Sequence, residues 1–191
     1  MSKNRLEAFS DGVIAIIITI MVLELRTPEG ADIKALLGFK HNFLSYALSF
    51  VFIGIYWNNH HHLLQVVTKV NGRILWANLH LLFWLSLIPL STNWMGDSNF
   101  AELPVAFYGS ILWLAGLAYY LLTLTLLAEH GKESALAAAL RSQVKEYISL
   151  GTYTLAIPLA FINTNVTLAL YVAVALIWLI PDRRIESRLK K

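Results

Sequence analysis

Long apolar stretches alternate with short polar segments along the whole chain. Each stretch approaches the roughly 20 residues that a helix needs to cross the hydrocarbon core of a bilayer. The segments between them carry helix-ending residues, as in Thr27-Pro28-Glu29-Gly30. The pattern predicts six membrane helices, over residues 9–25, 42–64, 74–95, 104–127, 147–162 and 166–180.

Composition supports a membrane protein. Hydrophobic residues make up 57% of the chain and charged residues only 14%, whereas soluble domains carry about 25% charged residues. The predicted fold class is therefore an all-α integral membrane protein, with residues 1–191 as a single six-helix domain. Cysteine is absent, which excludes disulfides, zinc–thiolate sites and thiol catalysis.

The basic residues predict an orientation. Six spans place both termini on the same side of the membrane, and Lys and Arg are enriched on the cytoplasmic side. Only Arg26, Lys34 and Lys40 fall on the opposite side. We therefore expect cytoplasmic termini in the plasma membrane, with residues 181–191 as a basic tail. The basic residues on the terminal side are Lys3, Arg5, Lys69, Arg73, Lys132, Arg141, Lys145, Arg183, Arg184, Arg188, Lys190 and Lys191.

A cleaved signal peptide is an alternative interpretation of the first apolar stretch. Lys3 and Arg5 precede a hydrophobic segment of suitable length. No A-x-A-like site follows it, because the chain continues as Glu24-Leu25-Arg26-Thr27-Pro28. We therefore treat the segment as the first membrane helix.

The first helix combines an apolar stripe with charge near its start. At about 100° per residue, Ile16, Thr19, Ile20 and Leu23 fall within a stripe about 100° wide. Asp11 lies about 140° from Ile16 on the same wheel, so it points to a different neighbour. A carboxylate inside a membrane is costly unless it faces the protein interior and finds a partner.

Partners for such a carboxylate occur at the same depth on the next two helices. Trp57 and His60 share a face of the second helix, and Asn78 lies on the third. The sequence predicts a buried polar network that clamps the first helix to the other two. Its expected members are Arg5, Ser10, Asp11, Trp57, His60 and Asn78.

Simpler interpretations stay open for each of these residues. Asp11 would suit the positive end of the helix dipole, and Thr19 would suit a hydrogen bond to the carbonyl four residues earlier in its own helix. In these simpler interpretations, the stripe with Ile16 packs against a neighbouring helix, and His61 and His62 are polar residues at the membrane interface. Consecutive histidines on a helix point about 100° apart, so we expect no metal site.

Several motifs together resemble one known family. The pattern R-x-x-x-F-S-D-G occurs at residues 5–12, W-x-x-H at Trp57 and His60, Asn78-Leu79 in the third helix, and Pro89 near its end. These resemble the transmembrane protein 175 family of lysosomal-type potassium channels, in its prokaryotic single-repeat form. The resemblance is most specific over residues 5–95, whereas the last three helices match in hydropathy only.

The resemblance implies a function and a site. It implies a homotetramer in which four copies of the first helix surround a pore permeable to potassium, without a TVGYG filter. Ile16, Ile20 and Leu23 would form hydrophobic constriction rings, and Thr19 a ring of hydroxyls. The network, to which the resemblance adds Phe9 of the F-S-D motif, would hold the pore helix on the side turned away from the pore. No cofactor, metal or nucleic-acid partner is implied; the partners are further copies of the chain, the lipid bilayer and permeant cations.

Two other functions compete with a channel. A proton-coupled secondary transporter would use Asp11 and His60 as a relay, but no second half of the chain resembles the first. A membrane enzyme would use the same groups as acid and base, but no nucleophile motif or metal-ligand spacing accompanies them. We therefore expect the chain to have no enzymatic activity.

Overall fold

A helix lies at each of the six predicted positions. The computed structural model describes residues 2–131, 136–137 and 143–179. The predicted tail 181–191 and most of the segment between α6 and α8 lie outside these residues. The helices are α1 (Lys3–Leu23), α2 (Ile33–Gly38), α3 (Lys40–Gln65), α4 (Gly72–Ser86), α5 (Ile88–Asp97), α6 (Glu102–His130), α8 (Val144–Leu159) and α9 (Thr164–Leu179).

Three features differ from the sequence expectation. The predicted third span, 74–95, is two helices, because Pro89 lacks a backbone N–H and its ring disfavours continuous helical hydrogen bonding, so the helix breaks at Leu87. Helix α1 begins at Lys3 instead of Phe9, since helix formation does not require apolar residues. The short α2 was not predicted; the Asp32 side chain caps it by accepting a hydrogen bond from the Ala35 N–H.

Within the described ranges, three stretches are long and apolar enough to cross a membrane by themselves. They are Lys3–Leu23, Gly72–Asp97, which joins α4 and α5, and Glu102–His130. Helix α3 is 26 residues long but carries more polar residues, and α8 and α9 have 16 residues each. The chain is therefore a membrane protein whose apolar helices differ in length and polarity.

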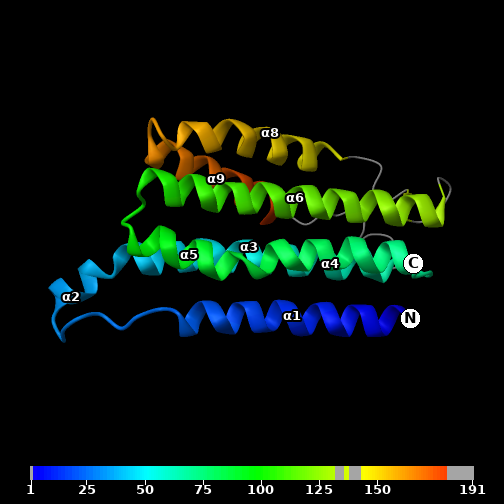
Figure 1. Ribbon diagram of the computed structural model, residues 1–191, viewed down its shortest axis with the longest axis horizontal. Helices are drawn as coiled ribbons and strands as arrows, with labels where there is room; N and C mark the ends of the chain where they lie inside the picture. The colour runs from blue at the N-terminus through cyan, green and yellow to red at the C-terminus, as the bar shows by residue number, and fades with distance from the viewer. Residues whose placement is uncertain (1, 132–135, 138–142, 180–191) are drawn as a thin grey trace.

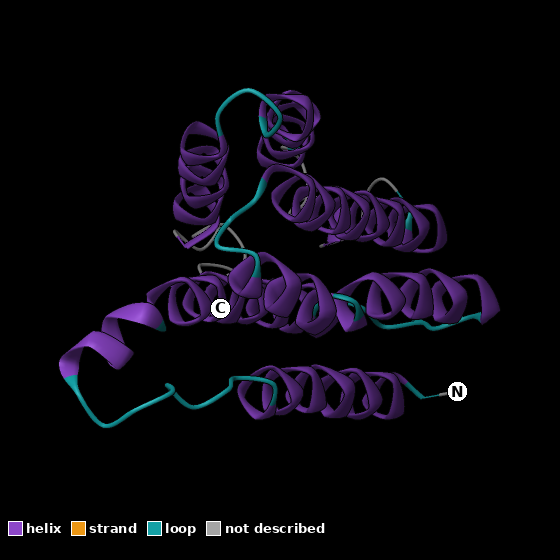
Figure 2. Ribbon diagram, turned by 60° about the vertical axis from the view of Figure 1, so that its left-hand side comes forward, coloured by secondary structure: helices purple, strands orange, loops and turns teal. Residues whose placement is uncertain are grey.

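The helices form three groups stacked in one direction (Figures 1 and 2). Helices α3, α4 and α5 form the middle group, and α6, α8 and α9 pack together on one side of it. Helix α1 lies alone on the other side, where it packs against α3, α4 and α5. Among the residues that the structure describes, one face of α1 therefore has no neighbour.

A buried hydroxyl cluster joins the middle group to α6. The Thr92 hydroxyl lies 2.7 Å from that of Ser49, and the Ser49 hydroxyl donates to the Tyr108 hydroxyl at 3.0 Å. These residues come from α5, α3 and α6, and all are buried. Mutual hydrogen bonding satisfies polar groups that would otherwise be costly at this depth.

Close approach of α6 and α9 depends on a glycine. The Tyr171 hydroxyl of α9 donates to the Val105 carbonyl at 3.1 Å, and this places it directly against Gly109. A Cβ at position 109 would overlap that hydroxyl, whereas one at Gly116 would meet only ordinary contacts at 3.5 Å or more.

Replacing Gly109 should therefore loosen the packing of α9 on α6. We expect Gly109→Ala to lower the stability by about 1–3 kcal/mol, the usual cost of overpacking a core. Thermal unfolding of the purified protein in detergent measures the effect, with Gly116→Ala as the matched control. Equal melting temperatures for the two variants would contradict this account of the contact.

Candidate pore helix and its polar anchor

Helix α1 has one buried face and one free face. The buried residues follow helical spacing and pack against the middle group: Leu6, Ser10, Ile14, Ile17 and Met21. The opposite face is apolar but exposed within the protomer. The exposed fraction is 58% for Ile16, 39% for Ile20 and 81% for Leu23. The stripe predicted from sequence is therefore the free face of α1.

A chain of buried hydrogen bonds holds the opposite face in place. The Asn78 amide nitrogen donates to the Ser10 hydroxyl oxygen at 2.9 Å, and the Ser10 hydroxyl donates to the Leu6 carbonyl at 2.9 Å. The Asn78 amide oxygen lies 2.7 Å from Nε2 of His60. All three side chains are nearly inaccessible to solvent. These hydrogen bonds join α1, α4 and α3 at one point. We call Ser10, Asn78 and His60 the polar anchor.

The anchor defines the state of the His60 ring. Because the Asn78 nitrogen donates to Ser10, its oxygen is the acceptor, so His60 donates through Nε2. The other ring nitrogen, Nδ1, is buried without a hydrogen-bond partner in the described part of the chain. A proton on Nδ1 would leave a buried donor unpaired, which is costly. The geometry therefore fits a neutral imidazole.

A second set of contacts joins α1 to α3 along its flank. The Trp57 indole nitrogen donates to the Asp11 carboxylate at 3.0 Å. One turn earlier, Glu7 lies 3.2 Å from Nδ1 of His61, whose ring stacks on that of Trp57. At the start of the helix, the Lys3 ammonium donates to the backbone carbonyl of residue 65 at 2.9 Å. We call these three contacts the flank contacts.

The structure divides the network predicted from sequence. Ser10, His60 and Asn78 lie together in the anchor, and Asp11 and Trp57 lie together on the flank. Arg5 and Phe9 are exposed, and no hydrogen bond or ion pair of Arg5 occurs among the described residues. Within the described part of one chain, Arg5 and Phe9 therefore take no part in the anchor or the flank contacts, and their place in the network stays a prediction. At about 100° per residue they lie roughly 20° to either side of Ile16, on the free face.

Thr19 bonds within its own helix, to the carbonyl three residues earlier instead of the expected four. Thr19 donates its hydroxyl hydrogen to the Ile16 carbonyl of its own helix at 2.8 Å, and its side chain is on the free face. Sequence reasoning missed Lys3 and Glu7. Lys3, Glu7 and Asp11 follow one another at intervals of four residues, which places all three on one side of α1. That spacing was the available signal.

Comparison with known proteins identifies the family. A sequence model described as the endosomal/lysosomal potassium channel TMEM175 matches residues 5–89. A potassium channel of Chryseobacterium sp. is 56% identical over 191 residues, which is 100% of both chains. The chain belongs to the TMEM175 family. The resemblance inferred from the sequence motifs is thus confirmed.

More distant members of the TMEM175 family show how the fold is shared. The endosomal/lysosomal proton channel TMEM175 of Gallus gallus is 30% identical over 193 residues, which covers 87% of this chain and 38% of that one. The crystal structure of a lysosomal potassium-selective channel TMEM175 homolog from Chamaesiphon minutus superposes with a TM-score of 0.82 at 24% identity, covering 94% of this chain and 97% of that chain. The helix arrangement described here is therefore a TMEM175 fold.

The anchor predicts a stability effect that can be measured directly. Asn78→Leu would leave His60 and Ser10 buried without their partner, and each unpaired group costs about 1–3 kcal/mol. We expect a clear fall in the melting temperature of the purified protein in detergent.

A matched control is available on α3. Asn58 is half-exposed and makes no hydrogen bond among the described side chains, so Asn58→Ala should leave the melting temperature close to that of the wild type. The anchor has no structural role if Asn78→Leu melts at the same temperature as this control.

Proposed function

We propose that this TMEM175 family member is a potassium-permeable channel of the plasma membrane, formed by four copies of the chain. The family and its named relatives are channels and not enzymes. The relatives from Chryseobacterium sp. and Streptomyces collinus, the latter 29% identical over 185 residues, are both named potassium channels. The proposal requires no cofactor, and the permeant ion is K⁺.

The free face of α1 is the observation that carries the pore assignment. Ile16, Ile20 and Leu23 are exposed in a helix whose other face is fixed by the anchor. Around a fourfold axis, this one face would meet its three copies. The pore would then run along the stripe, with α1 contributed by every subunit.

The residues on this face suit a hydrophobic gate. Rings of Ile16, Ile20 and Leu23 form narrow apolar constrictions, which exclude water and require an ion to shed part of its hydration. Thr19 lies between Ile16 and Ile20 along the helix, and its oxygen keeps lone pairs available after it donates to the Ile16 carbonyl. We assign it a ring of hydroxyls that contacts partly dehydrated ions.

We further propose that all six predicted spans cross the membrane, with cytoplasmic termini. The excess of basic residues on the terminal side supports this orientation. Because α4 and α5 follow each other as one stretch of 26 residues, they count as one crossing.

The transporter alternative finds less support in the geometry. A relay needs Asp11 and His60 to exchange protons directly or through one intermediate. In the described residues, Asp11 is bonded to Trp57 and His60 to Asn78, and no hydrogen bond joins the two pairs. The anchor thus suits a structural role better than proton transfer.

Ion flux from liposomes tests the channel assignment. Purified protein reconstituted in potassium-loaded vesicles should release K⁺ down its gradient without any second substrate, faster than it releases Na⁺ from matched sodium-loaded vesicles. Flux that saturates and requires a co-substrate would instead identify a transporter.

Substitutions on α1 test where the pore runs. Ile16→Asn or Leu23→Asn should hydrate the constriction and raise the unitary conductance or open probability by about tenfold, the effect of lowering a barrier by about 1.4 kcal/mol. Val22 is equally apolar and is 48% exposed, but lies about 120° from Ile16, so Val22→Asn is the matched control. Currents unchanged in both test variants, or changed equally in the control, would place the pore elsewhere.

A further inference from the structure

The charged residues at the start of α1 are divided between its two faces. Lys3, Glu7 and Asp11 lie four residues apart, and each makes a flank contact with α3. Their charges are therefore held against the protomer. Arg5 belongs to the same two turns but takes part in none of these contacts.

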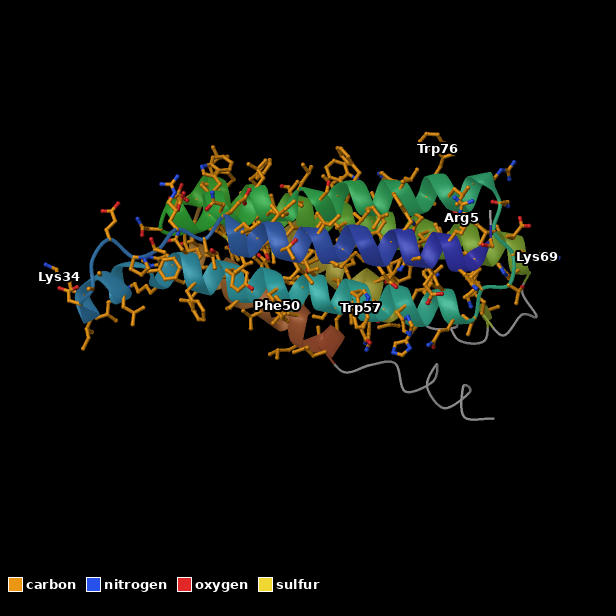
Figure 3. All side chains as sticks on the ribbon, turned by 90° about the horizontal axis from the view of Figure 1, so that it is seen from below. Arg5, Lys34, Phe50, Trp57, Lys69 and Trp76 are labelled. Atoms are coloured by element: carbon orange, nitrogen blue, oxygen red, sulfur yellow. The ribbon has the colours of Figure 1, made fainter. Side chains whose placement is uncertain are left out.

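Arg5 instead shares the free face with the apolar stripe. It precedes Ile16 by eleven residues, which places it about 20° from Ile16 around the helix and about 16 Å from it along the axis. Its side chain is exposed, and Figure 3, which looks onto α1 from its free side, shows it near the amino end of the helix. No acidic residue of α1 shares this position, since Glu7 lies about 180° from Ile16.

We infer that four Arg5 side chains form a positively charged ring at the amino-terminal mouth of the pore and limit the entry of cations there. This inference rests on the proposed arrangement of four α1 helices around the pore. Arginine side chains are permanently charged in proteins, so the ring carries a fixed positive charge. Its chemical target is the permeant monovalent cation, and its effect is to reduce the local concentration of K⁺ at this mouth.

The size of the effect depends on ionic strength. Charge rings at the entrance of a cleft create potentials of several kT, and a potential of one kT lowers the local cation concentration about threefold. The Debye length is about 30 Å at 0.01 M salt and about 3 Å at 1 M. The ring therefore restricts conduction in dilute salt and is screened in concentrated salt. Because it occupies one mouth only, currents in dilute salt should be larger for cations that enter from the opposite mouth.

Chemical modification of a single cysteine tests the sign of the effect. The chain contains no cysteine, so Arg5→Cys introduces the only thiol. In single-channel recordings with about 0.01 M KCl, Arg5→Cys should conduct at least about threefold better than the wild type. A positively charged methanethiosulfonate should return the conductance to the wild-type value, and a negatively charged one should raise it further. In about 1 M KCl these differences should nearly disappear.

Two controls separate a pore charge from a general surface charge. Arg5→Lys keeps the charge and should conduct like the wild type. Lys3→Gln removes one positive charge from the same end of α1, on the face held by α3, and should change the conductance much less. Single-channel conductance does not depend on how many channels fold, so a loss of expression does not mimic any of these results.

The outcomes distinguish this inference from the proposed function. If the wild type conducts K⁺ and Ile16→Cys responds to the reagents, but Arg5→Cys does not, the ring is refuted while the pore assignment stands. An equal effect of Lys3→Gln and Arg5→Gln also refutes the ring. If neither cysteine variant responds, α1 does not line the pore, and both the ring and the pore assignment are wrong.

Discussion

The hydrogen bond from Asn78 to Ser10 determines which face of α1 turns towards its own protomer. In a bilayer, apolar side chains gain little by moving from lipid to protein, so close packing and interhelical hydrogen bonds decide how a helix is rotated. A rotation of about 100° would bring Phe9 or Asp11 to the position of Ser10. Phe9 has no group that accepts the Asn78 hydrogen bond, and Asp11 would lose its bond to Trp57 and place a charge at a fully buried position. The orientation of the free face therefore follows from this contact together with the flank contacts to α3.

Because that rotation is fixed, the charged residues with partners, the buried apolar residues and the exposed apolar residues occupy separate faces of α1. Its charged residues with partners face α3, and its buried residues pack against the middle group. The stripe with Ile16 and Leu23 is exposed and would meet other copies in the proposed tetramer. A lipid-facing stripe would need no hydroxyl and no guanidinium. The presence of Thr19 and Arg5 on the free face is better matched by an aqueous path than by hydrocarbon, where such groups are costly.

The sequence predicted the helices well because each depends on local hydropathy. The break at Leu87 was missed because Pro89 is compatible with either a kinked or an interrupted helix. The polar network was predicted only in part. Residue type and depth grouped Arg5 with Asp11, although their angular positions on α1 differ by more than a quarter turn. Ser10 and Asp11 are adjacent in the chain but bond to different helices, and sequence alone does not assign a neighbouring helix to each direction around α1.

The position of the anchor along α1 has a mechanical consequence in the proposed pore. Ser10 lies about 9 Å from Ile16 and about 20 Å from Leu23 along the helix axis. If α1 tilts as a rigid rod about its anchored end, the displacement of each residue grows with this distance, so the Leu23 ring widens about twice as much as the Ile16 ring. The Ile16 ring then stays the narrower constriction in an open pore. Thr19 lies less than one helical turn from Ile16, so in the proposed pore an ion that sheds hydration at the Ile16 ring would have a hydroxyl close by.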